Sequence, residues 1–208
     1  GSTVRGTDLG VDYLLEGTVF RTGDRIHVNA ELLEVASGAA IWAEAYDRKA
    51  DELFSVQDDV VQSIAEKLSV PLTEAERRTI SRIPTANLEA YDFYQRAEFR
   101  PTGLSVQEAF LRSIPAYRHA IELDPAFAEA WAGYASEAAA IWRYDYSELM
   151  PSSYAKEEAY MAAGRALELD PENARAFGVL AIIQAVEGER DLAMQSARRA
   201  VELRPSDN

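Results

Sequence analysis

The residues that could perform chemistry in this sequence are mostly carboxylates. The 208 residues include 35 aspartates and glutamates against 21 lysines and arginines, with two histidines and no cysteine, so the net charge is −14. Without cysteine, thiolate catalysis, disulfides and cysteine-ligated zinc are excluded. Acid–base catalysis would need paired carboxylates in a cleft, or a nucleophile beside a base. The carboxylates instead recur at the spacing of exposed helix faces and helix caps, which predicts surface roles.

The histidines and glycines show no spacing typical of a catalytic or ligand-binding motif. His27 alternates with apolar residues on a predicted strand, and His119 lies far away in a predicted helix. Neither has a second ligand at the spacing of a metal site. Gly17, Gly23 and Gly38 lack the spacing of a phosphate-binding loop. We therefore expect no catalytic residue, no metal and no cofactor in this chain.

The charge of the chain restricts its partners. A strongly acidic chain lacks the basic surface that nucleic acids and anionic membranes require. The sequence also contains no run of 18 apolar residues that would predict a membrane span. We therefore expect a protein or peptide segment as the partner, including a segment of the same parent protein. We expect no nucleic acid and no required membrane contact.

The first part of the chain predicts a small antiparallel sheet. Apolar and polar residues alternate over residues 13–21, 25–35 and 40–47, and tight turns with glycine separate these three strands. The alternation is clearest in the middle strand, where one face consists of Ile26, Val28, Ala30 and Leu32. Three sequential strands with short connections form an antiparallel meander.

A helix is predicted to follow the third strand and to pack on the sheet. Its apolar stripe consists of Leu53, Val56, Val60, Ile64 and Leu68. Ser55 and Asp58 predict a capping box at its start, and Asp51 offers an alternative start one turn earlier. Pro71 would end this helix. A short charged helix over residues 74–83 would then connect to a second domain, with the boundary at residues 84–87.

From residue 88 onward the pattern is helical and repetitive. The run at residues 121–125 recurs at 167–171 and 201–205, and each copy ends in proline. The last two prolines are 34 residues apart, and alanines recur at fixed helix positions, so this part resembles a tetratricopeptide-repeat array. Three repeats are predicted. The middle one carries an insertion near residues 143–153, since its prolines are 46 residues apart.

In such repeat arrays the first helix of each pair lines the binding groove. The helix register places a mixed set of side chains there: Tyr94, Glu98, Glu129, Ala132, Ser136, Arg175, Gly178 and Ile182. This set lacks the lysines and asparagines that grip a peptide carboxylate, so the groove suits a basic or amphipathic segment. The insertion supplies Trp142, Tyr144 and Tyr146 as a second set of candidate contacts. These aromatic residues would either bind a partner or pack the insertion itself.

The front of the chain resembles a bacterial module related to the amino-terminal domain of TolB. The residues that carry this resemblance lie at 9–19, 23–26, 31–33, 37–48, 51–54 and 56–58. The module commonly precedes tetratricopeptide repeats, carboxy-terminal to class III adenylate/guanylate cyclase domains. It also occurs behind winged-helix DNA-binding domains and some Ser/Thr kinase domains. The module and the repeats together make the resemblance cover nearly the whole chain.

The resemblance implies an α+β fold in three parts. A truncated α/β module would cover residues 3–70, because the family's upstream strand and helix are absent. A helical connector would cover residues 71–87, and an all-α solenoid would cover residues 88–208. Residues 205–208 read like the start of a further repeat, so we expect a fragment of a longer protein. The open sheet edge and the uncovered last repeat predict a homo-oligomer.

The resemblance also implies a function. The fragment would be the non-catalytic regulatory and interaction region of a bacterial signalling protein, foremost an adenylate/guanylate cyclase. None of the cyclase metal-binding or nucleotide-binding motifs occurs in this sequence. The alternatives are the sensor half of a winged-helix transcription regulator and a stand-alone repeat scaffold. The expected location is the bacterial cytoplasm, or the periplasm if the parent has an upstream membrane span.

Overall fold

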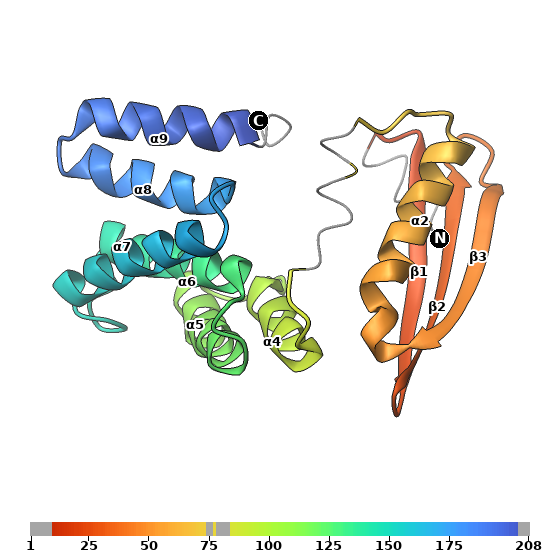
Figure 1. The fold of residues 1–208 in the computed structure, drawn as a ribbon, viewed down its shortest axis with the longest axis horizontal. Helices are drawn as coiled ribbons and strands as arrows, with labels where there is room; N and C mark the ends of the chain where they lie inside the picture. The colour runs from red at the N-terminus through yellow and green to blue at the C-terminus, as the bar shows by residue number, and fades with distance from the viewer. Residues whose placement is uncertain (1–9, 74–76, 78–83, 204–208) are drawn as a thin grey trace. The chain divides into compact units, whose positions relative to one another are not determined.

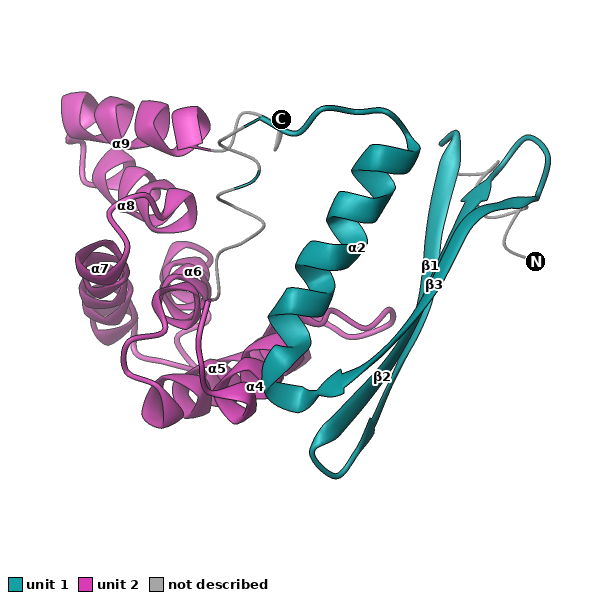
Figure 2. Ribbon diagram, turned by 45° about the vertical axis from the view of Figure 1, so that its right-hand side comes forward, with its two compact units in different colours: residues 1–83 teal, residues 84–208 magenta. Residues whose placement is uncertain are grey.

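The protein has an α+β fold, as the sequence predicts. A computed structural model describes residues 10–73, 77 and 84–203 (Figure 1). The chain divides into two compact units, residues 1–83 and residues 84–208 (Figure 2). The predicted helix over residues 74–83 lies outside the described residues, apart from Arg77, and so does the predicted repeat start at residues 205–208.

The first unit contains a three-stranded antiparallel meander. Its strands β1 (Tyr13–Thr22), β2 (Arg25–Glu34) and β3 (Ala40–Lys49) pair in sequence order. Only Gly23 and Asp24 separate β1 from β2, and the φ of 63° at Gly23 suits the tight hairpin turn. The predicted apolar face of β2 is confirmed, because its buried side chains are Ile26, Ala30 and Leu32.

One helix packs on this sheet. A short 3₁₀ segment, η1 (Ala50–Glu52), leads into α2 (Leu53–Lys67), which packs on β2 and β3 and buries Phe54 and Val56. The predicted capping box at Ser55 is wrong. Ser55 lies inside α2, and its hydroxyl donates to the carbonyl of Glu52 at 2.7 Å. The 3₁₀ segment therefore forms the entry to the helix.

The inner face of β1 is left largely open. Leu15 and Val19 lie on the same face as the buried residues of β2, yet they remain 51% and 62% exposed. The edge of β1 opposite β2 has no neighbouring strand among the described residues. The first unit therefore buries its apolar surface mainly between α2 and the other two strands.

The described residues of the second unit form three helix hairpins, which can be followed in Figure 1. The helices are α4 (Leu88–Glu98), α5 (Val106–Leu123), α6 (Ala128–Arg143), α7 (Ser152–Leu169), α8 (Ala174–Val186) and α9 (Arg190–Leu203). Alanines form most of the core between α6, α7 and α8, including Ala135, Ala159 and Ala163, all fully buried. Small side chains let neighbouring helices approach closely, so the repeated alanines produce a helical solenoid with the tetratricopeptide pattern.

The recurrent Leu-Asp-Pro run forms the turns between hairpins. The carboxylate of Asp124 accepts a hydrogen bond from the amide of Ala126 at 3.0 Å, and Asp170 accepts from Glu172 at 3.1 Å. Each aspartate thus closes a local turn just after its helix ends. Asn173 then caps α8 by accepting from the amide of Ala176 at 3.0 Å. The sequence motif therefore sets the geometry that stacks one hairpin on the next.

Candidate functional site

Five of the predicted groove residues lie close together on the first helices of the three hairpins. We call this surface the groove face and define it by Tyr94, Glu98, Glu129, Ser136 and Arg175. Arg175 on α8 forms an ion pair with Glu98 on α4. Its Nε also donates to Ser136 Oγ on α6 at 2.9 Å. These partners are 77 and 39 residues away in the sequence, so one guanidinium links all three first helices.

Tyr117, on the second helix α5, completes this network. Its hydroxyl donates to Glu98 Oε1 at 2.5 Å and accepts from Arg175 Nη2 at 3.4 Å. The ring is fully buried and packs directly on Gly133 of α6. A Cβ at position 133 would lie 2.2 Å from Cε1 of Tyr117, so this contact requires glycine. Sequence reasoning missed Tyr117, for which a glycine in the middle of an alanine-rich helix was the available signal.

A second ion pair lies beside the first. Arg100 pairs with Glu137 on α6, whose side chain is only 7% exposed. The Nη1 of Arg100 also donates to the carbonyl of Ala97 at 2.9 Å. Sequence reasoning also missed this pair, because Arg100 lies in the loop after α4 and Glu137 looked like a solvated helix position. The groove face therefore contains one ion pair, Glu98 with Arg175, and a second pair, Arg100 with Glu137, lies beside it.

Burial and neighbouring charges shift the pKa values on this surface in different directions. Burial alone would raise the pKa of Glu98, but the hydrogen bond from Tyr117 and the Arg175 guanidinium outweigh it and lower that pKa. Burial dominates at Glu137 and raises its pKa despite Arg100. Burial and the nearby Glu98 carboxylate raise the pKa of Tyr94 to about 12. Glu98 is therefore ionised and Tyr94 is neutral at neutral pH.

The arrangement is suited to binding. Among the residues that the structure describes, no cluster of three or more histidines, aspartates and glutamates could hold a metal ion. His27 Nδ1 lies 3.5 Å from Asp47 on the sheet, and His119 Nδ1 lies 3.2 Å from Glu122 on α5. Both histidine side chains are nearly half exposed. What the groove face offers is charge, hydrogen-bonding groups and an aromatic ring.

The remaining residues predicted for the groove are Ala132, Gly178 and Ile182. Ala132 is buried in the core, so its predicted place in the groove is wrong; it packs in the alanine-rich core that α6 shares with its neighbouring helices. Ile182 follows Arg175 by two turns on the same face of α8, and it lines a groove between α8 and α9 together with Arg143 of α6. A Cβ at Gly178 would meet no atom within 4 Å, so this position is open.

The aromatic residues of the insertion do not form one surface. Trp142 packs against the core, and the ammonium of Lys156 lies 5.9 Å from the centre of its ring. Tyr146 packs edge-on against Phe110, with ring centres 5.4 Å apart. Tyr144 is 64% exposed, and the Arg143 guanidinium lies over its ring at 5.6 Å. Tyr144 is therefore the one of the three that offers its ring to a partner.

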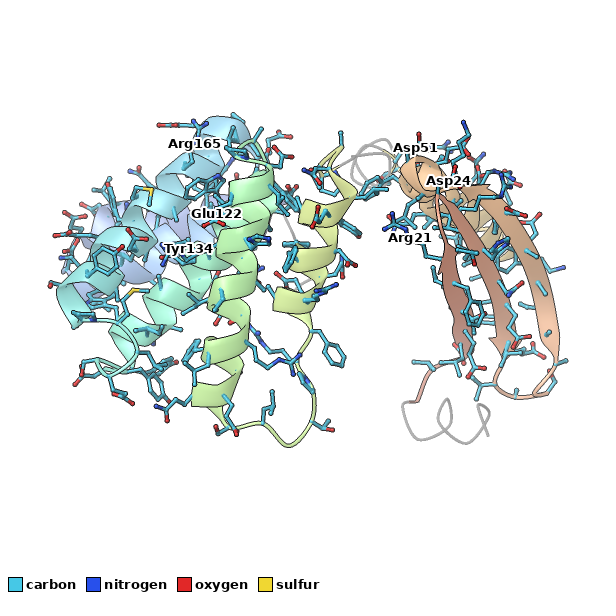
Figure 3. The ribbon with its side chains drawn as sticks, turned by 90° about the horizontal axis from the view of Figure 1, so that it is seen from below. Arg21, Asp24, Asp51, Glu122, Tyr134 and Arg165 are labelled. Carbon is cyan, nitrogen blue, oxygen red and sulfur yellow. The ribbon has the colours of Figure 1, made fainter. Side chains whose placement is uncertain are left out.

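Figure 3 shows the side chains of both units, with Tyr134 of α6 labelled among those of the helical unit. The Tyr134 hydroxyl donates to Glu158 on α7 at 2.5 Å, which ties the two helices of the middle hairpin together.

None of the described helices is both long enough and apolar enough to cross a membrane.

Comparison with known proteins found one related sequence. No family model matches the chain. The chain is 37% identical over 128 residues to a protein of Rhizobium meliloti (strain 1021) named "Putative adenylate cyclase 3". The match covers 60% of this chain but only 21% of that protein, so the chain spans about a fifth of its relative.

Several solved structures are similar at low identity. The second TPR of Spaghetti (RPAP3), bound to an HSP90 peptide, is 22% identical with a TM-score of 0.41, over 55% of this chain and 92% of that one. YrrB, a TPR protein with an unusual peptide-binding site, is 19% identical with a TM-score of 0.41, over 76% and 71%. MamA is 18% identical with a TM-score of 0.35, over 71% and 68%.

Proposed function

We propose that this chain is a non-catalytic protein-interaction region of a bacterial signalling protein, and that the groove face is its binding surface. The observation that carries the proposal is the contact of Arg175 with Glu98 and Ser136, which joins the first helices of all three hairpins. A surface held by such contacts is preorganised, so a partner loses less conformational entropy of the protein on binding.

The proposed partner is a basic or amphipathic polypeptide segment. Arg175 pairs with Glu98 and Arg100 pairs with Glu137, so Glu129 beside Tyr94 leaves the groove face and its flanking ion pair with a net charge of about −1 by charge counting. The whole chain carries a net charge of −14, which favours the approach of a cationic segment. The segment belongs either to another protein or to the parent protein of this chain.

The proposed parent is an adenylate/guanylate cyclase of the bacterial cytoplasm. The 37% identity with a protein named as an adenylate cyclase favours this parent over a transcription regulator. In this proposal the first unit is the TolB-like module, and the helical unit regulates or recruits. Cyclic-nucleotide synthesis would belong to a part of the parent outside these residues.

Fluorescence anisotropy with two defined peptides tests the binding proposal. One is an amphipathic helix of lysine and leucine, and the other replaces each lysine with glutamate. The full 208-residue chain should bind the basic peptide, more weakly as salt rises, and should not bind the acidic one. Glu129→Lys should weaken this binding. The control Glu157→Lys makes the same charge change at an exposed position of α7, outside the groove face.

Two results would contradict the proposal. Equal binding of the acidic and basic peptides would show that charge on the groove face does not select the partner. Equal loss of affinity in Glu129→Lys and Glu157→Lys would show that net charge acts without a defined site.

A further inference from the structure

The middle first helix, α6, carries opposite charges at its two ends. Glu129 lies in its first turn and Arg143 in its last turn, with Ser136 midway between them. Each step is seven residues, which is close to two full turns, so the three side chains follow one face of the helix. At a rise of about 1.5 Å per residue, Glu129 and Arg143 are about 21 Å apart along the helix axis. This face therefore presents an anion, a hydroxyl and a cation in a row.

Contacts with α8 place this row on the side of the groove face. Ser136 Oγ accepts a hydrogen bond from Nε of Arg175 at 2.9 Å, and both residues belong to that face. Two turns further along each helix, Arg143 and Ile182 line one groove. The seven-residue step is thus kept on α6 and on α8. Arg143 belongs to the middle hairpin, so described hairpins flank it on both sides.

The guanidinium of Arg143 is available to a partner. The residue is exposed, and among the described residues no carboxylate forms an ion pair with it. Its guanidinium lies 5.6 Å from the ring centre of Tyr144, which is 64% exposed. This contact holds the cation at the surface beside an aromatic ring. We call Arg143 and Tyr144 the basic end. Adding Arg143 to the groove face and its flanking ion pair leaves no net charge by charge counting.

We propose that the basic end extends the binding surface, and that the groove face and the basic end together select a polypeptide segment with one cationic end and one anionic end. The cationic end of the segment lies at Glu129, and its anionic end lies at Arg143, about 21 Å away. This inference rests on the proposed function and adds the charge order of the partner. A uniformly basic segment meets Glu129 but places a like charge against Arg143, so it gains less from the basic end.

Fluorescence anisotropy with three amphipathic helices of equal length tests this charge order in the full chain. All three have leucine on the apolar face. The first has lysine along its whole polar face, the second has lysine in one half and glutamate in the other, and the third has the same lysines and glutamates interleaved. The segregated helix should bind about fivefold more tightly than the interleaved one, because it alone meets both charges in blocks. These two helices have the same composition and net charge, so their difference reports charge order.

Arg143→Glu separates recognition from helix stability. It should weaken binding of the segregated helix roughly fivefold and strengthen binding of the uniformly basic one. A role limited to the α6 dipole would change the free energy of unfolding and leave this preference as it is. Arg143→Glu combined with Glu129→Lys should recover the segregated helix, which can bind turned end for end. Arg112→Glu is the matched control, because it makes the same charge change at an exposed position of α5, and it should leave the preference unchanged.

Equal binding of the segregated and interleaved helices overturns the inference. If the uniformly basic helix still binds and needs Glu129 to do so, the proposed function stands without this charge order. If none of the three helices binds, the proposed function fails as well. The role of the basic end is also overturned if Arg143→Glu has the same effect as Arg112→Glu, or if the double variant fails to recover the segregated helix.

Discussion

The contact between Tyr117 and Gly133 makes Gly133→Ala a sharp test of the groove-face network. In most helices alanine stabilises relative to glycine by about 1 kcal/mol. Here the new Cβ would lie 2.2 Å from Cε1 and 2.5 Å from Cζ of a fully buried ring. Overpacking of this kind costs about 1–3 kcal/mol. Moving the ring also pulls its hydroxyl from Glu98, a hydrogen bond to a charged group worth about 1.5–3 kcal/mol.

We expect Gly133→Ala to lower the free energy of unfolding by about 2–4 kcal/mol after the helix-propensity gain is subtracted. Urea denaturation followed by circular dichroism at 222 nm measures this change, since most helices lie in the second unit. Gly164→Ala and Gly178→Ala are matched controls in the interiors of α7 and α8, where a Cβ would meet nothing within 4 Å. Both should stabilise by up to about 1 kcal/mol.

A double-mutant cycle separates this explanation from a general intolerance at position 133. In a Tyr117→Leu background the ring is gone, so Gly133→Ala should become neutral or stabilising. The reasoning is refuted if Gly133→Ala behaves like the two control glycines. It is also refuted if the penalty of Gly133→Ala persists unchanged without the Tyr117 ring.

Three further predictions concern the charges, their pH dependence and the caps of the helical unit. Glu98→Gln should lower the free energy of unfolding by about 1–2 kcal/mol at pH 7, because Arg175 loses its anionic partner; both side chains of this pair are about one-third exposed. Glu137→Gln should lower it less, because burial already disfavours the ionised form of Glu137 and the Arg100 side chain can turn towards water. The pKa of Glu98 is lowered, so its contribution to folding stability is full above the ordinary glutamate pKa and is lost as the pH falls through the lowered pKa. Urea denaturation at pH values from 7 to 3 should therefore show that Glu98→Gln loses less stability in acid than wild type does. Equal losses of stability would contradict the direction of the pKa shift. Asn173→Ala should lower the free energy of unfolding by about 1 kcal/mol, because it removes the side-chain cap of α8. Asn29→Ala, at an exposed position of β2, should change the melting of the helices little. Equal effects of the two substitutions would refute the capping role of Asn173.

The sequence predicted the elements of this fold because their signals are local. Alternation over ten residues identifies β2, and the Leu-Asp-Pro run with its alanines identifies the hairpins of the helical unit. Of the two predicted starts for α2, the cap at Ser55 is wrong because Ser55 lies inside the helix, whereas the earlier start at Asp51 falls in the 3₁₀ segment that forms the entry. Ala132 was misplaced, because its alanine-rich helix buries several faces at once.

The candidate site was predictable only in part. Helix register identified Glu98, Ser136 and Arg175 as residues of one surface. It could not show that they contact one another, since these contacts depend on how three hairpins stack across 39 and 77 residues. Tyr117 was missed because it comes from a second helix, which the register assigns to packing. The ring packs in the helical core, but its hydroxyl reaches Glu98 on the first helix of the same hairpin.

NMR can show directly whether the basic peptide binds on the groove face. The full chain, labelled with ¹⁵N, would be titrated with the basic amphipathic peptide, and the shifted amides would be assigned. We expect the largest shifts to cluster on α4, α6 and α8 around Tyr94, Glu129 and Arg175, and we expect Glu129→Lys to remove them. Shifts that spread over the second helices α5, α7 and α9, or that are confined to the first unit, would contradict binding at the groove face. So would shifts that stay unchanged in Glu129→Lys.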